Sequence, residues 1–210
     1  MRPDWIELQL RRRGIRDERV LAAMAHVPRE AFVPAGARRH AYADAALSLP
    51  HGQTISQPYI VALICQALEL QGDERVLDVG TGSGYQAAVL AELAAEVVSV
   101  ERIPELAEQA RRNLEAAGYD VDVRVGDGSL GVPERAPFDA IAVAATAPAI
   151  PEPLYEQLAT GGRLVLPIDE SLVSLAKTPA GLKARFLSPA RFVPLVSGLP
   201  DRGPGMTGSS

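Results

Sequence analysis

The feature that most constrains the fold is a glycine-rich turn between a short apolar strand and a helix. Residues 75–79 read as a strand that runs directly into the segment GTGSG at 80–84, and residues 85–93 then have helical spacing. Glycines at such a junction let backbone N–H groups approach a ligand closely, and the start of the helix adds unpaired donors. The segment therefore predicts a strand–loop–helix unit whose loop can bind a ligand.

Strands and helices continue to alternate after this unit. Strands are expected at 97–101, 121–125, 138–143 and 163–166, and helices at 104–117 and 154–158, with the glycine pair 161–162 turning the chain into the last of these strands. Such alternation favours parallel pairing with right-handed crossovers. Residues 172–177, 183–187 and 192–196 read as further strands without helices between them. We therefore predict an α/β fold with a doubly wound, mostly parallel sheet.

The N-terminal third is predicted to be a helical extension of this core. Helices are expected near 4–13, from an Asp17 cap through residue 24, and at 58–70, with Gly14 ending the first. Residues 35–58 form a long connection of the kind that often carries function. We predict a single domain over 1–210, with the helices and this loop in 1–70, the α/β core in 71–197 and a flexible tail in 198–210.

Three carboxylates stand at or near the ends of the predicted parallel strands. Asp78 lies two residues before Gly80, where it would repel a phosphate but attract an ammonium or a sulfonium. Glu101 ends the second strand, a position that can bind two ribose hydroxyls. Asp127 and Gly128 follow the third strand and could read an adenine edge. Together these residues predict a binding site for an adenosine that carries an amino acid, such as S-adenosylmethionine.

Other interpretations of these residues stay open at this point. The glycine spacing is G-x-G-x-G and not the G-x-G-x-x-G typical of dinucleotide folds, so a nicotinamide oxidoreductase is disfavoured. Asp78 could instead be a buried carboxylate that braces the loop, Glu101 a surface charge at a strand end, and Asp127 a plain turn residue.

Composition excludes several classes of protein. The single cysteine, Cys65, leaves no disulfide framework or cysteine-built zinc site and is expected to pack in the core, and with three histidines we predict no metal. The 26 acidic residues outnumber the 21 basic ones, chiefly over 73–140, which disfavours a nucleic-acid partner. The arginine run 11–13 is read as a solvated helix end.

Because no apolar run approaches the roughly 20 residues of a membrane span, and the N-terminus lacks a signal-peptide core, we predict a cytoplasmic protein without a membrane partner. We also predict a monomer.

Several further segments carry a resemblance that covers residues 15–197. They are REAFVP at 29–34, AYAD at 41–44, GQTISQPY at 52–59, ATAP at 145–148, GGRL at 161–164 and RFVPLV at 191–196. With these motifs the chain resembles the protein-L-isoaspartate (D-aspartate) O-methyltransferases. The resemblance implies a Rossmann-like, S-adenosylmethionine-dependent methyltransferase fold. It also implies methyl transfer to the α-carboxyl of L-isoaspartyl residues in damaged proteins, giving an ester that cyclises to a succinimide.

The resemblance also implies roles for individual residues. The family's active-site serine falls on Ser56, its methionine and ribose contacts on Asp78, Gly80 and Glu101, and its adenine contacts on Asp127 and Gly128. We add Gly82 and Gly84 of the loop as cofactor contacts, and Thr54, Ile55, Val193 and Leu195 as contacts for the peptide substrate. The last two are expected on a strand edge that pairs with the peptide backbone. Ser48 and Pro50 depart from the family pattern, which usually has a proline and a glycine at these positions.

The expected chemistry needs no general base, because a carboxylate acceptor is already ionised at pH 7. Ser56 Oγ and nearby backbone amides would orient it. Ser56 could also be the N-cap of the 58–70 helix, a role compatible with the first, and His51 is read as a polar loop residue. The alternatives are a methyltransferase of the same fold with a small-molecule or other acceptor, and a peptide-binding adaptor without turnover.

Overall fold

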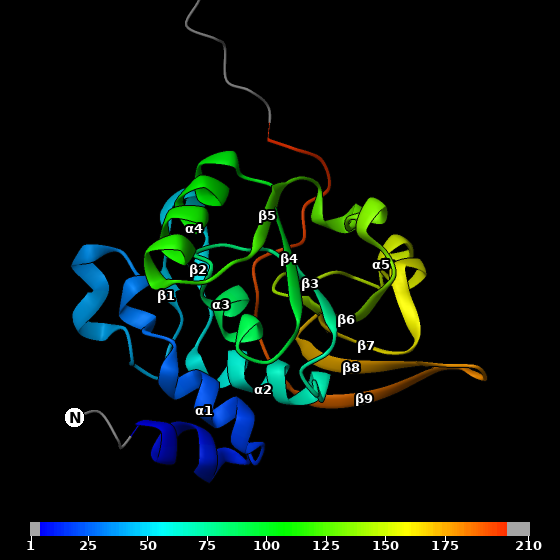
Figure 1. Ribbon diagram of the computed structural model, residues 1–210, viewed down its shortest axis with the longest axis horizontal. Coiled ribbons are helices and arrows are strands. Elements are labelled where there is room, and N and C mark those ends of the chain that lie inside the picture. The colour runs from blue at the N-terminus through cyan, green and yellow to red at the C-terminus, as the bar shows by residue number, and fades with distance from the viewer. Residues whose placement is uncertain (1–4, 201–210) are drawn as a thin grey trace, which may run out of the picture.

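The computed structural model describes residues 5–200 of the chain and is built around one seven-stranded sheet (Figure 1). The strand order is β5-β4-β3-β6-β7-β8-β9, with parallel pairs from β5 to β7 and antiparallel pairs from β7 to β9. The strands are β3 (Arg75–Val79), β4 (Glu96–Glu101), β5 (Asp122–Val125), β6 (Phe138–Val143), β7 (Leu158–Ile168), β8 (Ser171–Thr178) and β9 (Gly181–Pro189). The order reverses between β3 and β6, where open α/β sheets bind their ligands.

Helices cover both faces of the sheet. The α-helices are α1 (Glu18–His26), α2 (Pro58–Leu68), α3 (Tyr85–Ala91), α4 (Pro104–Ala117) and α5 (Glu152–Gln157). One buried cluster joins Val76, Val97 and Ala140 of the sheet to α1, α2, α3 and α4. A second joins Leu77, Val98 and Ile141, which point to the opposite face, to α5. Successive residues of each strand thus pack alternately into two hydrophobic cores, which is why these strands are apolar throughout.

Local signals set several boundaries as predicted. Helix α4 begins with Pro104 in its first turn, buries Leu106, Ala110 and Leu114, and ends at Gly118 in the left-handed conformation. Helix α1 begins where the Asp17 carboxylate accepts from the N–H groups of Arg19 and Val20. Both caps satisfy backbone groups that a helix end leaves unpaired, so they fix the ends of the helices.

The connection from 35 to 58 is ordered by short elements. A helical turn covers Ala35–His40, and strands β1 (Leu47–Ser48) and β2 (Thr54–Ile55) pair antiparallel around the turn Pro50–Gly52. Ser48 thus lies in β1 opposite Thr54, and His51 is exposed at the turn. This hairpin brings β2 to the glycine loop, since a Cβ on Gly82 would lie 4.0 Å from Thr54 O.

Three predicted elements differ in the structure. The glycine pair 161–162 lies inside β7 at a register shift against β6: Leu158 pairs with Phe138 and Arg163 with Ala140, so the residues between them form a bulge in the strand. Residues 192–196 form no strand: the segment makes one isolated bridge, between Pro194 and Thr146. The predicted helix near 4–13 is a run of π and 3₁₀ turns, Ile6–Leu10 and Arg11–Arg13, and residue 4 lies outside the described residues.

Cys65 is buried in α2. In the arginine run, Arg11 forms an ion pair with Glu18 and Arg13 forms one with Asp44, so these two positive charges have carboxylate partners. Most of the tail predicted at 198–210 lies outside the described residues. Within residues 5–200, no helix has both the length and the apolar character needed to cross a bilayer.

Candidate active site

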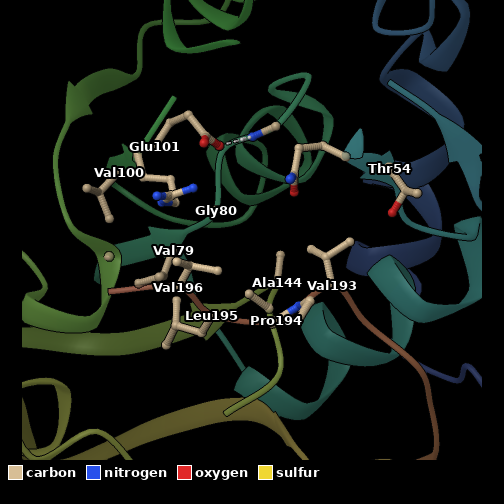
Figure 2. Close-up of a pocket in the computed structure, with 15 residues that line it drawn as sticks. Thr54, Val79, Gly80, Val100, Glu101, Ala144, Val193, Pro194, Leu195 and Val196 are labelled. Carbon is tan, nitrogen blue, oxygen red and sulfur yellow. Dashed lines mark hydrogen bonds between the residues drawn. The ribbon is translucent and has the colours of Figure 1, made fainter. Parts of the chain in front are cut away.

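A cleft opens at the carboxyl ends of β3, β4 and β6, at the point where the strand order reverses (Figure 2). Its volume of about 630 Å³ includes space that is open to solvent. We call it the strand-end cleft. It is lined by Gln53, Thr54, Val79, Gly80, Gly82, Val100, Glu101, Arg102, Gly128, Ala144, Ala145 and the segment from Val193 to Val196. Four side chains predicted to contact cofactor or substrate line this cleft, together with three of the predicted glycines: Thr54, Glu101, Val193 and Leu195, and Gly80, Gly82 and Gly128.

Glu101 lies at the end of β4 and is held by the backbone beside it. Its Oε2 accepts from the N–H of Gly82 at 2.9 Å, and its Oε1 accepts from the N–H of Ile103 at 3.0 Å. The side chain is only 6% exposed, yet it lines the cleft. Figure 2 shows the bond that ties this carboxylate to the glycine loop. Glu101 is therefore no loose surface charge, and its carboxylate faces the cleft in a fixed orientation.

Asp78 is fully buried behind the glycine loop and lines none of the cavities described here. Gln86 Nε2 and Ser99 Oγ donate to its two oxygens at 2.8 and 2.7 Å, and Thr81 Oγ1 lies 2.6 Å from Ser99 Oγ. Burial raises the pKa of Asp78 to about 6, against the lowering effect of these two donors. This is the bracing arrangement that the sequence left open, and any attraction of Asp78 for a cation acts from behind the loop.

Asp127 caps the turn Gly128–Leu130 and holds the segment that follows Val196. Its Oδ1 accepts from the N–H of Ser129, and its Oδ2 accepts from the N–H of Gly198 at 2.6 Å. Partial burial opposes ionisation, but these hydrogen bonds lower the pKa of Asp127 below its usual value. Gly128 lines the cleft, and a Cβ there would lie 2.6 Å from Val79 Cγ1. A side chain at this position would fill the space next to the Val79 wall.

Gly84, predicted as a cofactor contact, lies outside the lining of the strand-end cleft. It is the N-cap of α3 with φ +90°, and a Cβ would lie 3.1 Å from Leu114 Cγ. The structure thus explains this glycine by its backbone conformation and by the close packing of α4 on the loop.

Two further cavities meet around β2. The serine cavity, of about 790 Å³, is lined by Ala46, Thr54, Ser56, Gln57, Ile60 and residues 189–192. The junction cavity, of about 300 Å³, is lined by Thr54, Ile55, Ser56, Val61, residues 80–83, Tyr85, Gln86 and Ala144. Thr54 lines all three cavities, and Ser56 lines the serine and junction cavities. These two residues therefore stand between the strand-end cleft and the serine cavity.

The hydroxyl of Ser56 is not used as a helix cap. The N-cap of α2 is Gln57, and no side chain caps that helix. The capping role considered for Ser56 is therefore wrong, since Pro58 occupies the first turn of α2 and brings no N–H of its own.

Val193 and Leu195 line the strand-end cleft, but on a segment that is not a strand. Thr146 donates its N–H to Val193 O at 2.8 Å and accepts from Leu195 N–H at 2.7 Å. Pro194 between them has no N–H. The predicted pairing of a peptide with this edge therefore has few backbone groups available.

Sequence reasoning missed several residues that build the site. Val79 and Val100 form apolar walls, and Ala144 lies just after β6. The rule that ligands bind beyond the carboxyl ends of parallel strands would have found these three. Gln86 braces Asp78 from α3, and Arg29 donates to Ser56 O from a turn 27 residues earlier. No local pattern signals such long-range contacts.

A comparison with protein-family models decides the family. The model described as protein-L-isoaspartate (D-aspartate) O-methyltransferase matches residues 4–199. The chain belongs to the protein-L-isoaspartate (D-aspartate) O-methyltransferase family. The resemblance noted in the sequence is thereby confirmed over nearly the whole chain.

Named relatives agree with this family. A protein-L-isoaspartate O-methyltransferase of Methanoculleus marisnigri is 53% identical over 200 residues, covering 93% of this chain and 91% of the relative. A protein-L-isoaspartate O-methyltransferase 2 of Marinobacter nauticus is 61% identical over 169 residues, covering 80% of this chain and 77% of the relative.

Solved structures of the same family share the fold. A protein-L-isoaspartate O-methyltransferase matches with a TM-score of 0.82 at 31% identity, covering 94% of this chain and 66% of the other. A putative member from Plasmodium falciparum, solved with S-adenosyl-L-homocysteine, matches with a TM-score of 0.80 at 27% identity, covering 93% of this chain and 98% of the other. The predicted Rossmann-like methyltransferase fold is confirmed.

Proposed function

We propose that this chain moves the methyl group of S-adenosylmethionine to the α-carboxyl of L-isoaspartyl residues in damaged proteins. The resulting ester cyclises spontaneously to a succinimide, from which some chains return to normal aspartate. The observation that carries the proposal is the position of Thr54 and Ser56 between two cavities, one suited to a nucleoside and one open to a peptide.

The strand-end cleft fits the cofactor. Glu101 offers a fixed carboxylate for the ribose hydroxyls, while Val79 and Val100 offer apolar walls and Gly128 leaves room for a flat base. Asp127 holds the turn that carries Gly128, and Asp78 braces the loop behind Gly80 and Gly82. When bound, S-adenosylmethionine supplies a methyl group activated by a sulfonium.

The serine cavity fits the acceptor. Ser56 Oγ and the backbone amides of β2 are the donors available to hold a carboxylate at the junction cavity, with Ile55 in its lining. Val193 and Leu195 line the strand-end cleft and neither of these two cavities, and their backbone bonds go to Thr146, so we assign their side chains to the cofactor side of the site.

The reaction requires no proton transfer to or from the side chains of the site. An ionised carboxylate oxygen forms its bond to the methyl carbon as the carbon–sulfur bond breaks, and no proton moves. The residues lower the barrier by alignment, which is worth up to ~7–11 kcal/mol in favourable systems, and by keeping water from the two ions. No group of three or more His, Cys, Asp or Glu side chains in the described part of the chain is placed to hold a metal ion.

The test uses labelled S-adenosylmethionine and two peptides that differ only in isoaspartate or aspartate at one position. We expect label in the isoaspartyl peptide alone, as a base-labile ester. Ser56→Ala should lower the rate, and Ser171→Ala, at the start of β8 and outside the cavities, is the matched control. Equal labelling of both peptides would instead favour a broader carboxylate acceptor, and binding without label would favour an adaptor.

The oligomeric state and location belong to the same proposal. We propose a monomer, because one chain supplies the linings of all three cavities, and a cytoplasmic location, because the single cysteine is buried and unpaired. Light scattering of the purified chain and fractionation of cells that express it test the two statements.

A further inference from the structure

Arg29 is a fully buried arginine that lies behind the predicted active-site serine. It comes from the turn Arg29–Ala31 and is 0% exposed. Its Nε donates to Ala41 O and its Nη2 donates to Ser56 O, both at 2.7 Å. The guanidinium carbon lies 4.6 Å from the centre of the Tyr85 ring. Arg29 thus links the N-terminal turn, the β2 segment and the start of α3.

The charge of Arg29 is not neutralised by the described residues. None of their carboxylates forms an ion pair with it, and its Nη1 has no hydrogen-bond partner. Burial lowers the pKa of the guanidinium, but an arginine side chain stays protonated in proteins. Burying a charge without a counter-ion costs free energy. A neutral side chain could donate to the same two backbone carbonyls and pack on the same aromatic ring without that cost.

Both of its site-facing neighbours line the junction cavity, while Arg29 itself lies behind them. Ser56 and Tyr85 are part of that lining and Arg29 is not. Nη2 lies 2.7 Å from Ser56 O, and a serine hydroxyl is roughly 3–4 Å from its own carbonyl oxygen, so the guanidinium is within about 7 Å of Ser56 Oγ. A carboxylate bound to that hydroxyl would lie within reach of the charge.

We propose that Arg29 is a positioning residue that selects for a negatively charged acceptor: it fixes Ser56 through its carbonyl and supplies the buried positive charge that a substrate carboxylate completes. The proposal rests on the proposed function. It explains why a cation that has no counter-ion among residues 5–200 is kept in the core, and it assigns the preference for a carboxylate to a residue that does not touch the substrate.

Arg191 is the rival source of positive charge. It also lines the serine cavity, but its side chain is 86% exposed and pairs with Glu170. Exposed pairs of this kind contribute little because solvent screens them. Arg29 is buried, so its field reaches the junction cavity with less screening.

The experiment measures binding, with the chain saturated by S-adenosylhomocysteine so that no turnover occurs. Two peptides are titrated by calorimetry, one with the isoaspartyl α-carboxylate and one with the α-carboxamide at the same place. The wild-type chain should prefer the carboxylate by roughly tenfold or more, as expected for unit charges ~8–10 Å apart at an effective dielectric constant of ~20. If the wild type binds neither peptide, the proposed function fails before Arg29 is tested.

Variants then separate charge from scaffold. Arg29→Met should lose most of the preference and Arg29→Lys should keep most of it, while the affinity for S-adenosylhomocysteine changes less than threefold in both. Arg19→Met is the matched control, since Arg19 also donates to two backbone carbonyls, Leu70 O and Leu93 O, away from the site. The proposal is overturned if Arg29→Met keeps the preference, if the Met and Lys variants lose it equally, or if Arg191→Met alone removes it.

A measurement on the wild type covers the case in which Arg29→Met does not fold. The Nε–H resonance of Arg29, assigned by its absence in Arg29→Lys, should shift when the carboxylate peptide binds and much less with the carboxamide. Equal shifts with both peptides, or none, would overturn the proposal.

Discussion

Asp78 should make the stability of the ligand-free chain fall as pH rises. Its pKa is raised from 3.8 to about 6, chiefly by burial and in smaller part by repulsion from Glu101. The folded chain therefore holds this proton more tightly than the unfolded chain between about pH 4 and pH 6. Stability from this group is present below pH 4 and is lost as pH rises through 6.

The magnitude follows from the two pKa values. They differ by about two pH units, and each unit corresponds to ~1.4 kcal/mol, so the full effect is about 3 kcal/mol. Between pH 4.5 and pH 7.5, about 2 kcal/mol of this free energy of unfolding should be lost. Asp78→Asn removes the titration, while Gln86 and Ser99 can reorient to bond the amide.

The assay is urea unfolding of the wild type and Asp78→Asn at several pH values. Taking the difference between the two removes the other groups that titrate in the same range. We expect the wild type to lose about 2 kcal/mol relative to the variant from pH 4.5 to 7.5. Asp120→Asn, at an exposed position, is the control. A difference between wild type and Asp78→Asn that stays flat with pH would refute desolvation as the cause.

Four other substitutions test the site and the fold. Ser56→Ala should lower kcat by roughly 10–100-fold through loss of an orienting donor, with the dissociation constant of S-adenosylhomocysteine unchanged by calorimetry. Glu101→Ala should raise that dissociation constant at least tenfold, and unchanged affinity would remove Glu101 from the cofactor site. Gly128→Ala should cost ~1–3 kcal/mol in urea unfolding, because its Cβ would lie 2.6 Å from Val79 Cγ1, and an unchanged midpoint would contradict the close approach. Asp17→Ala should cost ~1 kcal/mol through the lost cap while kcat/KM stays at the wild-type value; a drop in activity would show that α1 reaches the site.

The elements predicted well are those whose signals are local. Helix α4 carries its own start at Pro104, its own stop at Gly118 and an apolar face between them, so the sequence defines it without tertiary contacts. The glycine pair 161–162 is different. A local breaker suggests a turn, but in the structure the pair lies in a bulge within β7, between the Leu158–Phe138 and Arg163–Ala140 pairs.

The site divides in the same way. Glu101 could be predicted because a strand end fixes both its position and its direction, and the structure holds it at the cleft. Arg29 lies within a recognised motif, yet its position behind Ser56 depends on how the 29–41 segment folds over α3. Residues 192–196 read as a strand in the sequence, but the segment lies outside the seven-stranded sheet and makes a single bridge to Thr146.

The path of residues 193–196 back to Thr146 has a consequence for how the protein folds. All seven strands are complete by residue 189, yet one wall of the strand-end cleft comes from residues 193–196 (Figure 1, Figure 2). Because residues 193–196 belong to none of the seven strands, the sheet can form before its nucleoside site has that wall. A fragment ending at residue 189 should therefore fold around the sheet with its cleft open, and it should bind the cofactor more weakly than the full chain.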